Sequence, residues 1–374
     1  MGKRELLLIA AFLIAGALVY QVTVPPPVPG ERSFSVSQLI ENIRRGVRGN
    51  RAFAETSSTS THPVAAGVTE LRLTLRGADV TITGEDRTTI ETQLHVRSNG
   101  FDAQEAERLA KASVLKLDDA ATSILGSIDY PEEGRQTATI TLKVPARLAI
   151  RLNPTIGDLK IGNVAAVELL NARGDTQITK VAGRVTANQM SGELRVAGAG
   201  SLKLTTRGTD VTLEHVGGES VLNFRGGEVK GSDLVGAVEI ESNGTDITLE
   251  KLETTRGTLR VNAVNGTVTL RGLRTDGRID ARDAEVSVDI DRAAPLTIYA
   301  EGTDDVIVTA PAGGYQLDAV AQRGRVTVPD GTLQVSVNGQ EQRAAGAVRG
   351  GGGTITIRSA RGDVIVKERG RSDR

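Results

Sequence analysis

Four aspartates occupy one position in a recurring turn, a pattern in which a solenoid can hold calcium. Each follows a Gly-Ala or Gly-Thr pair where a strand is expected to begin: Asp79, Asp210, Asp246 and Asp304. Stacked turns bring such carboxylates together around Ca²⁺. Calcium-binding nonapeptide repeats need tandem G-G-x-G-x-D turns, however, and the sequence contains none. We therefore expect these carboxylates to accept hydrogen bonds from the amides of their own turns, and we predict no metal site.

The histidines do not form a pattern that serves zinc binding or general-base catalysis. His62 lies in a polar stretch, His95 flanks an expected strand and His215 begins a turn, without an H-E-x-x-H or H-x-E grouping. The chain has no cysteine, which removes thiolate ligands, disulfides and thiol catalysis. The glycine run 350–353 continues into an expected strand and is not a phosphate cradle. We predict no catalytic, cofactor-binding or metal-binding residues.

Arg207, Arg225 and Glu241 are placed by the repeat spacing so that they could approach one another. The two arginines are 18 residues apart, and Glu241 falls near the following turn. Enzymes that cleave polysaccharides on a solenoid use clustered carboxylates and cations, so such an enzyme is an alternative interpretation. Charges on a repeating scaffold are usually solvated, and we expect these three side chains to be ordinary surface charges.

A repeat that begins after Gly157 must position these residues. A short phrase recurs in which glycine and one or two polar residues precede an apolar–polar–apolar run, as in 157–161 and 192–196. Two interleaved apolar series keep a spacing of 18 residues: Val211, Val229 and Ile247, and Leu204, Leu222 and Ile240. One rung therefore holds two strands that stack on their counterparts. The sequence predicts an all-β fold, a parallel β-solenoid over residues 156–368 with apolar side chains inward.

The rungs at each end of a solenoid need a cap, because one rung cannot bury its own apolar face. We predict a strand-rich N-terminal cap over residues 67–155 with one helix. Asp102 and Glu105 form a capping box for that helix, and Ala106, Leu109 and Ala110 give it an apolar face. The basic segment 367–374, including a tail at 369–374, is expected to shield the last edge strand. An up-and-down barrel or a sandwich is the competing architecture.

The N-terminal segment predicts export. Lys3 and Arg4 precede an uncharged run at 6–24, which as a helix spans about 28 Å, close to the hydrocarbon thickness of a bilayer. The positive charges place the short N-terminus inside and the body outside. We predict that residues 1–24 are a membrane anchor with a single transmembrane helix; a signal peptide cleaved near 15–17 is the alternative. Residues 25–66, rich in proline and then polar, are predicted to be a linker.

Composition narrows the class of partner. Lys+Arg number 45 against Asp+Glu 46, a net charge of −1, so the cationic footprint of a nucleic-acid binder is missing. Aromatic residues make up 2% of the chain, and tryptophan is absent, which leaves few rings for stacking. The 43 glycines among many β-forming residues suit short strands and tight turns.

Three stretches carry a resemblance to a known family. The Gly-Asp-Val-x-Ile phrases, the helix DAQEAERLAKA at 102–112 and the segment GGGGTITIRSARGDVIVKERG at 350–370 resemble a bacterial adhesin-like family of unknown function, the domain-of-unknown-function 4097 type. The resemblance covers residues 68–368. It implies an extracytoplasmic β-solenoid, often tethered by one N-terminal helix, and brings no established catalytic motif.

Together these patterns predict a membrane-anchored, extracytoplasmic, non-enzymatic structural or interaction protein. Its expected partners are the membrane, through residues 6–24, and an envelope protein or surface polymer. No cofactor and no nucleic acid are expected. The alternatives are an extracellular polysaccharide-active enzyme and an envelope-stress sensor or regulatory subunit. The ligand and the oligomeric state do not follow from the sequence.

Overall fold

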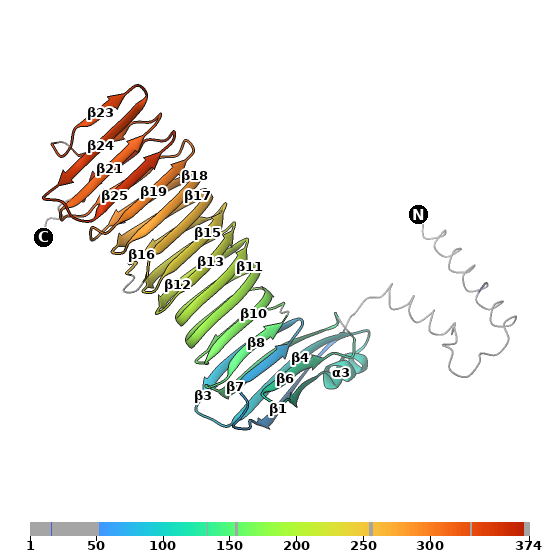
Figure 1. Cartoon of the computed structure of the whole chain (residues 1–374). Helices are drawn as coiled ribbons and strands as arrows, with labels where there is room; N and C mark the ends of the chain where they lie inside the picture. The colour runs from blue at the N-terminus through green and yellow to red at the C-terminus, as the bar shows by residue number, and fades with distance from the viewer. Residues whose placement is uncertain are drawn as a thin grey trace, which may run out of the picture. The chain divides into compact units, whose positions relative to one another are not determined.

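The computed structural model describes Gly16 and residues 52–132, 134–153, 156–253, 257–329 and 331–369. The chain forms two compact units, described separately here. The smaller contains Val96–Ser113, Tyr130–Gln136 and the chain up to Thr56; the larger contains Ser57–His95, Val114–Asp129 and Thr137–Arg374. Between residues 52 and 369 the described chain holds one helix, α3, among many strands, so the all-β prediction is confirmed (Figure 1).

The predicted membrane anchor, residues 6–24, lies outside the described residues apart from Gly16, and so does the linker up to residue 51. In the part of the chain that is described, no helix combines the length and the apolar character needed to cross a membrane.

In the smaller unit, the predicted helix forms over Ala103–Ala112 (α3). Its capping box is confirmed: the Asp102 carboxylate accepts a hydrogen bond from the Glu105 amide at 2.8 Å, and the Glu105 carboxylate accepts one from the Phe101 amide at 2.6 Å. The predicted apolar face, Ala106, Leu109 and Ala110, is buried. The same unit contains a cation–π contact, in which the Arg97 guanidinium lies 4.8 Å from the centre of the Phe53 ring.

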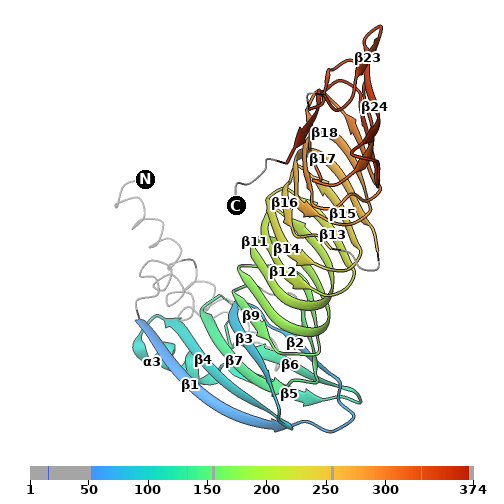
Figure 2. The same ribbon diagram turned by 90° about the vertical axis from the view of Figure 1, so that its left-hand side faces the viewer.

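The larger unit is built from two ladders of parallel strands, which form opposite sides of one stack (Figure 2). Ladder A runs in the order β6 (Ser123–Asp129), β2 (Glu70–Thr74), β8 (Ala149–Asn153), β10 (Ala166–Arg173), β11 (Thr176–Arg207), β13 (Ser220–Arg225), β15 (Val238–Asn243), β17 (Leu259–Leu273), β18 (Gly277–Ile290), β19 (Leu296–Glu301), β25 (Thr354–Ser359) and β21 (Tyr315–Ala321).

Ladder B shares the long strands β11, β17 and β18 with ladder A. It runs in the order β7 (Gln136–Pro145), β3 (Ala78–Glu85), β9 (Leu159–Gly162), β11, β12 (Thr209–Val216), β14 (Glu228–Leu234), β16 (Asp246–Glu250), β17, β18, β20 (Val306–Ala310), β26 (Val364–Glu368) and β22 (Val326–Thr327).

Both apolar series predicted from the sequence are confirmed as register partners. Val211 pairs with Val229 and Val229 with Ile247 in ladder B, while Leu204, Leu222 and Ile240 pair in the same way in ladder A. All six side chains are buried between the ladders. Alternate outward residues are polar, which is the expected pattern for strands with one face in the core.

Left-handed backbone conformations allow the chain to turn from ladder A into ladder B. Gly226 and Gly244 have φ of +71° and +63°, and Asn265 reaches +56° at the equivalent place. Gly227 has a second reason to be glycine. A Cβ built there would lie 2.3 Å from the carbonyl oxygen of Thr209 on the adjacent rung, closer than van der Waals contact permits.

Strands distant in sequence are inserted at both ends of the stack. Near the start, β2 lies between β6 and β8, so that Leu71 pairs with both Ile124 and Ile150. Near the other end, β25 lies between β19 and β21, and Ile357 pairs with both Ile298 and Ala319. In ladder B, β3 and β26 are inserted in the same manner. We call β2, β3, β25 and β26 the inserted strands.

The prediction that residues 367–374 shield the last edge is therefore wrong. Lys367 belongs to β26, an inserted strand with a neighbour on each side. The outer strands in ladder A are β24 (Glu341–Val348) and β23 (Val335–Asn338), an antiparallel hairpin that pairs with β21. The apolar strand β25 needs packing on both sides, because Ile355 and Ile357 are fully buried. Residues 370–374 lie outside the described residues.

Two predicted boundaries also need correction. Residues 52–63 form β1 (Ala52–Pro63) and not the end of a linker. This strand pairs with β4 (Thr89–Gly100), and Ser57 is hydrogen-bonded to His95 at 3.0 Å. Threonine, which recurs in the segment, has a high propensity for strands. The boundary between cap and solenoid at 155/156 does not separate two folds, because β8 pairs with β10 and β9 with β11 in continuous ladders.

At the start of ladder A, β6 also pairs with β5 (Val114–Asp119), which runs antiparallel to it.

One carboxylate joins three strands at the C-terminal end. Asp318 on β21 accepts hydrogen bonds from Arg343 on β24, at 3.0 Å, and from Arg358 on the inserted strand β25. Burial acts to raise the pKa of Asp318, but the bonds from Arg358 and Arg343 outweigh it and hold that pKa below its ordinary value.

We predict that Asp318→Asn lowers the free energy of unfolding by ~1–2 kcal/mol at pH 7. Because the pKa is lower in the folded state, the carboxylate stabilises the fold above its unfolded pKa of about 3.9 and ceases to do so as the pH falls through the folded value. Thermal melts should therefore show a stability difference between Asp318→Asn and wild type that is constant between pH 6 and 8, because this range lies ~2 units or more above the unfolded pKa. The difference should shrink below about pH 4. Glu239→Gln, an exposed charge on β15, is the control. A difference that persists undiminished at ~pH 3 contradicts the role of the ionised carboxylate.

Candidate functional site

Asp79, Asp210 and Asp246 occupy equivalent positions in ladder B, but at β20 that position belongs to Asp305 and not to the predicted Asp304. The partners of Asp79 and Asp210 also differ from the prediction. The Asp79 carboxylate accepts from the amide of Asp158 at 3.0 Å, and Asp210 accepts from the amide of Glu228 at 3.0 Å. Both donors belong to the neighbouring rung. The prediction of bonds within the same turn is wrong for these two, because in-register stacking places the next rung's amide beside the carboxylate. Asp246 and Asp304 make no such side-chain bond among the described residues.

An acidic row results at the start of the ladder B strands, interrupted by Thr267 on β17 between Asp246 and Glu285. It consists of Asp79, Asp158, Asp175, Glu193, Asp210, Glu228, Asp246, Glu285, Asp305 and Asp363. Several of its carboxylates bond amides of the next rung, as Asp305 does with Asp363 at 2.9 Å. Lys230 lies 2.9 Å from Glu228. Within the described ranges, no three His, Cys, Asp or Glu side chains come together as metal ligands.

The histidines have separate partners. His62 is hydrogen-bonded to Asp119 at 2.9 Å and His95 to Ser57 at 3.0 Å. His215 lies 3.4 Å from Asp233. Each ring is therefore held by one side chain of its own surroundings.

Two of the three residues that the repeat spacing was expected to bring together, Arg225 and Glu241, line one hollow on the outer face of ladder A. This hollow of ≈ 420 Å³ is also lined by Asn223 and Asn243, above Phe224 and Ser242. The Asn223 amide donates to the Glu241 carboxylate at 3.2 Å. Arg207 pairs in register with Arg225 on the adjacent strand but does not line this hollow.

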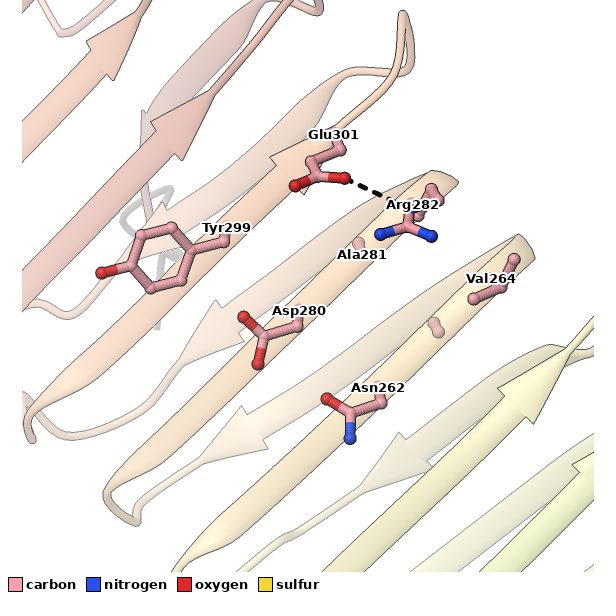
Figure 3. A pocket seen from close by; sticks show the side chains of 8 residues that line it. Asn262, Val264, Asp280, Ala281, Arg282, Tyr299 and Glu301 are labelled. Carbon is pink, nitrogen blue, oxygen red and sulfur yellow. Dashed lines mark hydrogen bonds and ion pairs between the residues drawn. The ribbon is translucent and has the colours of Figure 1, made fainter.

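A second hollow, of ≈ 320 Å³, lies on the next strands of the same face, β17, β18 and β19 (Figure 3). Ala263 and Ala281 form its floor. Its polar and aromatic lining is Asn262, Asp280, Arg282, Tyr299 and Glu301, and Val264 adds one apolar side chain. Since β13, β15, β17, β18 and β19 are consecutive in ladder A, the two hollows follow one another along the stack.

We call this surface the polar track. Its first row is Asn223, Glu241, Asn262, Asp280 and Tyr299, and its second row is Arg225, Asn243, Val264, Arg282 and Glu301. Each residue pairs in register with the next one of its row. Stacking therefore converts residues that are about 18–21 apart in sequence into neighbours at roughly 4.8 Å per strand.

Ion pairs fix the side chains around Tyr299. Arg278 forms two hydrogen bonds with Asp280, at 2.7 and 2.8 Å, and its guanidinium lies 4.7 Å from the centre of the Tyr299 ring. The hydrogen bonds that Arg278 donates to Asp280 raise the pKa of the Arg278 guanidinium. Arg282 is hydrogen-bonded to Glu301 at 3.2 Å. The track thus carries both signs of charge and no strong net charge.

Sequence reasoning missed Tyr299. The low aromatic content argued against exposed rings, yet this one is 39% exposed and lines a hollow. A signal was present: in the alternating strand LTIYAE, Leu296 and Ile298 are inward, so Tyr299 must face outward.

Comparison with known families confirms the resemblance predicted from the sequence. Residues 68–233 match the family model described as Toastrack DUF4097. This region contains helix α3 and the ladders as far as β14. No curated protein matches the chain.

Solved structures to which the chain is similar include three bacterial proteins. A putative cell adhesion protein from Clostridium sporogenes is 10% identical over 84% of this chain and 100% of that chain, with a TM-score of 0.20. A putative adhesin from Parabacteroides distasonis is 11% identical over 84% and 97%, with a TM-score of 0.31. A putative lipid binding protein from the same species is 11% identical over 83% and 97%, with a TM-score of 0.26.

We predict that the turn aspartates stabilise the stack without a metal. Asp79→Ala should lower the free energy of unfolding by ~0.5–1.5 kcal/mol, because the Asp158 amide exchanges its carboxylate acceptor for water. Asp246→Ala, in the same row but without such a bond, should change it by less than ~0.5 kcal/mol. Chemical denaturation of the full chain in detergent measures both. A rise in stability on adding Ca²⁺ that Asp79→Ala abolishes would instead establish a metal role.

Proposed function

We propose that this protein is an extracytoplasmic interaction module, tethered to the membrane by residues 6–24, that holds an extended partner along the polar track. The observation that carries the proposal is the pair of hollows that follow one another on neighbouring strands of ladder A. Ligand sites are typically concave and present a few polar groups in fixed positions. Both features recur here along one face.

The scaffold supports this role because it fixes the side chains of the track before a partner arrives. Each strand of the track has a paired strand on both sides, and the inward residues Leu222, Ile240, Val261, Ile279 and Ile298 are buried beneath it. A surface held in this way loses little conformational entropy on binding. A partner that lies across the strands can therefore contact several rungs at once, and the weak contacts of each rung add together.

The tether and the outside location rest on sequence. Lys3 and Arg4 stand before the apolar run 6–24, which favours retention of the N-terminus on the inner side. Alkaline extraction of membranes tests this part of the proposal. The full chain should remain in the membrane pellet, whereas a chain lacking residues 6–24 should be extracted.

Binding is tested by sedimentation of the full chain, held in lipid nanodiscs, with cell envelopes of the source organism. The variant Arg282→Ala/Glu301→Ala removes an ion pair of the track, and Glu228→Ala/Lys230→Ala removes a similar ion pair on ladder B. We expect wild type and the ladder B variant to sediment equally, and the track variant to bind about tenfold more weakly. Equal binding by all three proteins contradicts the proposal.

A further inference from the structure

The ring of Tyr299 is held ready for stacking. Arg278 lies over the ring at 4.7 Å and is itself fixed by two bonds to Asp280, so the side chain is ordered while 39% of its surface stays exposed. Figure 3 shows Tyr299, Asp280 and Asn262 on three neighbouring strands, beside the row of Glu301, Arg282 and Val264. An exposed aromatic ring beside polar groups suits a ligand that has both an apolar face and hydrogen-bonding groups.

The polar groups of the track match a ligand rich in hydroxyls. Asn223, Asn243 and Asn262 each supply donors and an acceptor, and a hydroxyl can use both. Glu241 and Asp280 only accept, and the guanidinium groups only donate. Because carboxylates and guanidinium groups nearly balance, the track selects neither a strongly acidic nor a strongly basic polymer. A neutral ligand is the best match to this mixture.

The position of the track on a sheet face distinguishes between classes of polymer. The backbone amides and carbonyls of β15, β17 and β18 are already paired with neighbouring strands. An extended peptide binds to sheets chiefly through free backbone groups at an edge, and these strands are not edges. A nucleic acid needs clustered cations that are not neutralised by carboxylates. A sugar chain needs neither, since its hydroxyls bond to side chains.

The dimensions favour a chain over a single sugar. The five strands of the track span roughly 19 Å at ~4.8 Å per strand. The floor of the second hollow is made by the small residues Ala263 and Ala281, which leave room for a ring to lie close to the sheet. Several sugar rings in a row would each meet a different pair of side chains.

We propose that the polar track binds a neutral, linear polysaccharide that runs across the strands, with Tyr299 stacked against the apolar face of one sugar ring. This inference rests on the proposed function and names the class of partner for it. The sugar face contacts the tyrosine ring, and the asparagines and carboxylates hydrogen-bond to the hydroxyls at its rim. No bond of the sugar is broken.

The test is isothermal titration of the full chain in nanodiscs with cello-, xylo-, manno- and chito-oligosaccharides of about six sugars, long enough to exceed the roughly 19 Å span of the track. At least one should bind wild type. Tyr299→Ala should weaken that binding by about tenfold or more, while Tyr299→Phe, which keeps the stacking ring, should stay within about threefold. Phe53→Ala is the matched control, because Phe53 is also an exposed ring beneath a guanidinium, that of Arg97.

Absence of binding to every oligosaccharide, or equal binding by Tyr299→Ala and wild type, overturns the inference. Thermal melts of each variant establish that the fold is retained. Failure here is distinguishable from failure of the proposed function. If Arg282→Ala/Glu301→Ala loses envelope binding but no neutral oligosaccharide competes for it, the track binds another class of partner. If that variant binds envelopes like wild type, the track is not the binding surface at all.

Discussion

Strands of the larger unit pair in register, so every inward side chain packs between equivalent side chains of the rungs before and after it. Leu222 lies between Leu204 and Ile240, and all three are shielded from water. Complete burial of such a side chain stabilises the fold by roughly 1.5–3 kcal/mol. That gain requires a neighbour on each side, so a rung has little stability alone. The same register places outward residues in rows, and both the acidic row and the polar track follow from it.

The inserted strands keep apolar strands away from the edges that register pairing creates at the ends. A stack of parallel strands leaves an open edge at each end, and such edges pair readily with other chains. Here β2 and β25 are covered on both sides by strands that follow or precede them by tens of residues. Carboxylates reinforce the joins: Asp79 bonds the amide of Asp158, and Asp305 that of Asp363. Each inserted strand is thus joined to strands far from it in the sequence.

The regular middle of the stack was predictable from sequence, because apolar residues at a constant spacing of 18 must lie above one another. Helix α3 was predictable for a local reason, its capping box. The inserted strands were not, since the separation of Leu71 from Ile150, or of Ile298 from Ile357, follows no repeat. The hydrogen bond of Asp79 was not predictable from its own turn, because the donor is the Asp158 amide on the next rung.

The candidate site divides in the same way. The approach of Arg225 and Glu241 followed from the repeat spacing, and the structure places them in one hollow. Tyr299 lies beyond the most regular rungs of the repeat. Its register pairing with Asp280 could not be predicted from the number of aromatic residues in the chain. A surface of this kind depends on register over several strands, so it becomes visible only when the rungs are assembled.

Hydrogen exchange of the full chain tests most directly whether the inserted strands lie inside the stack, paired on both sides. If they do, the amides of Thr354–Ser359 in β25 should exchange as slowly as those of Leu296–Glu301 in β19, although β25 lies near the end of the sequence. The edge strand Val335–Asn338 should exchange much faster. If the amides of β25 exchange as fast as those of β23, β25 is not paired on both sides and the insertion is contradicted.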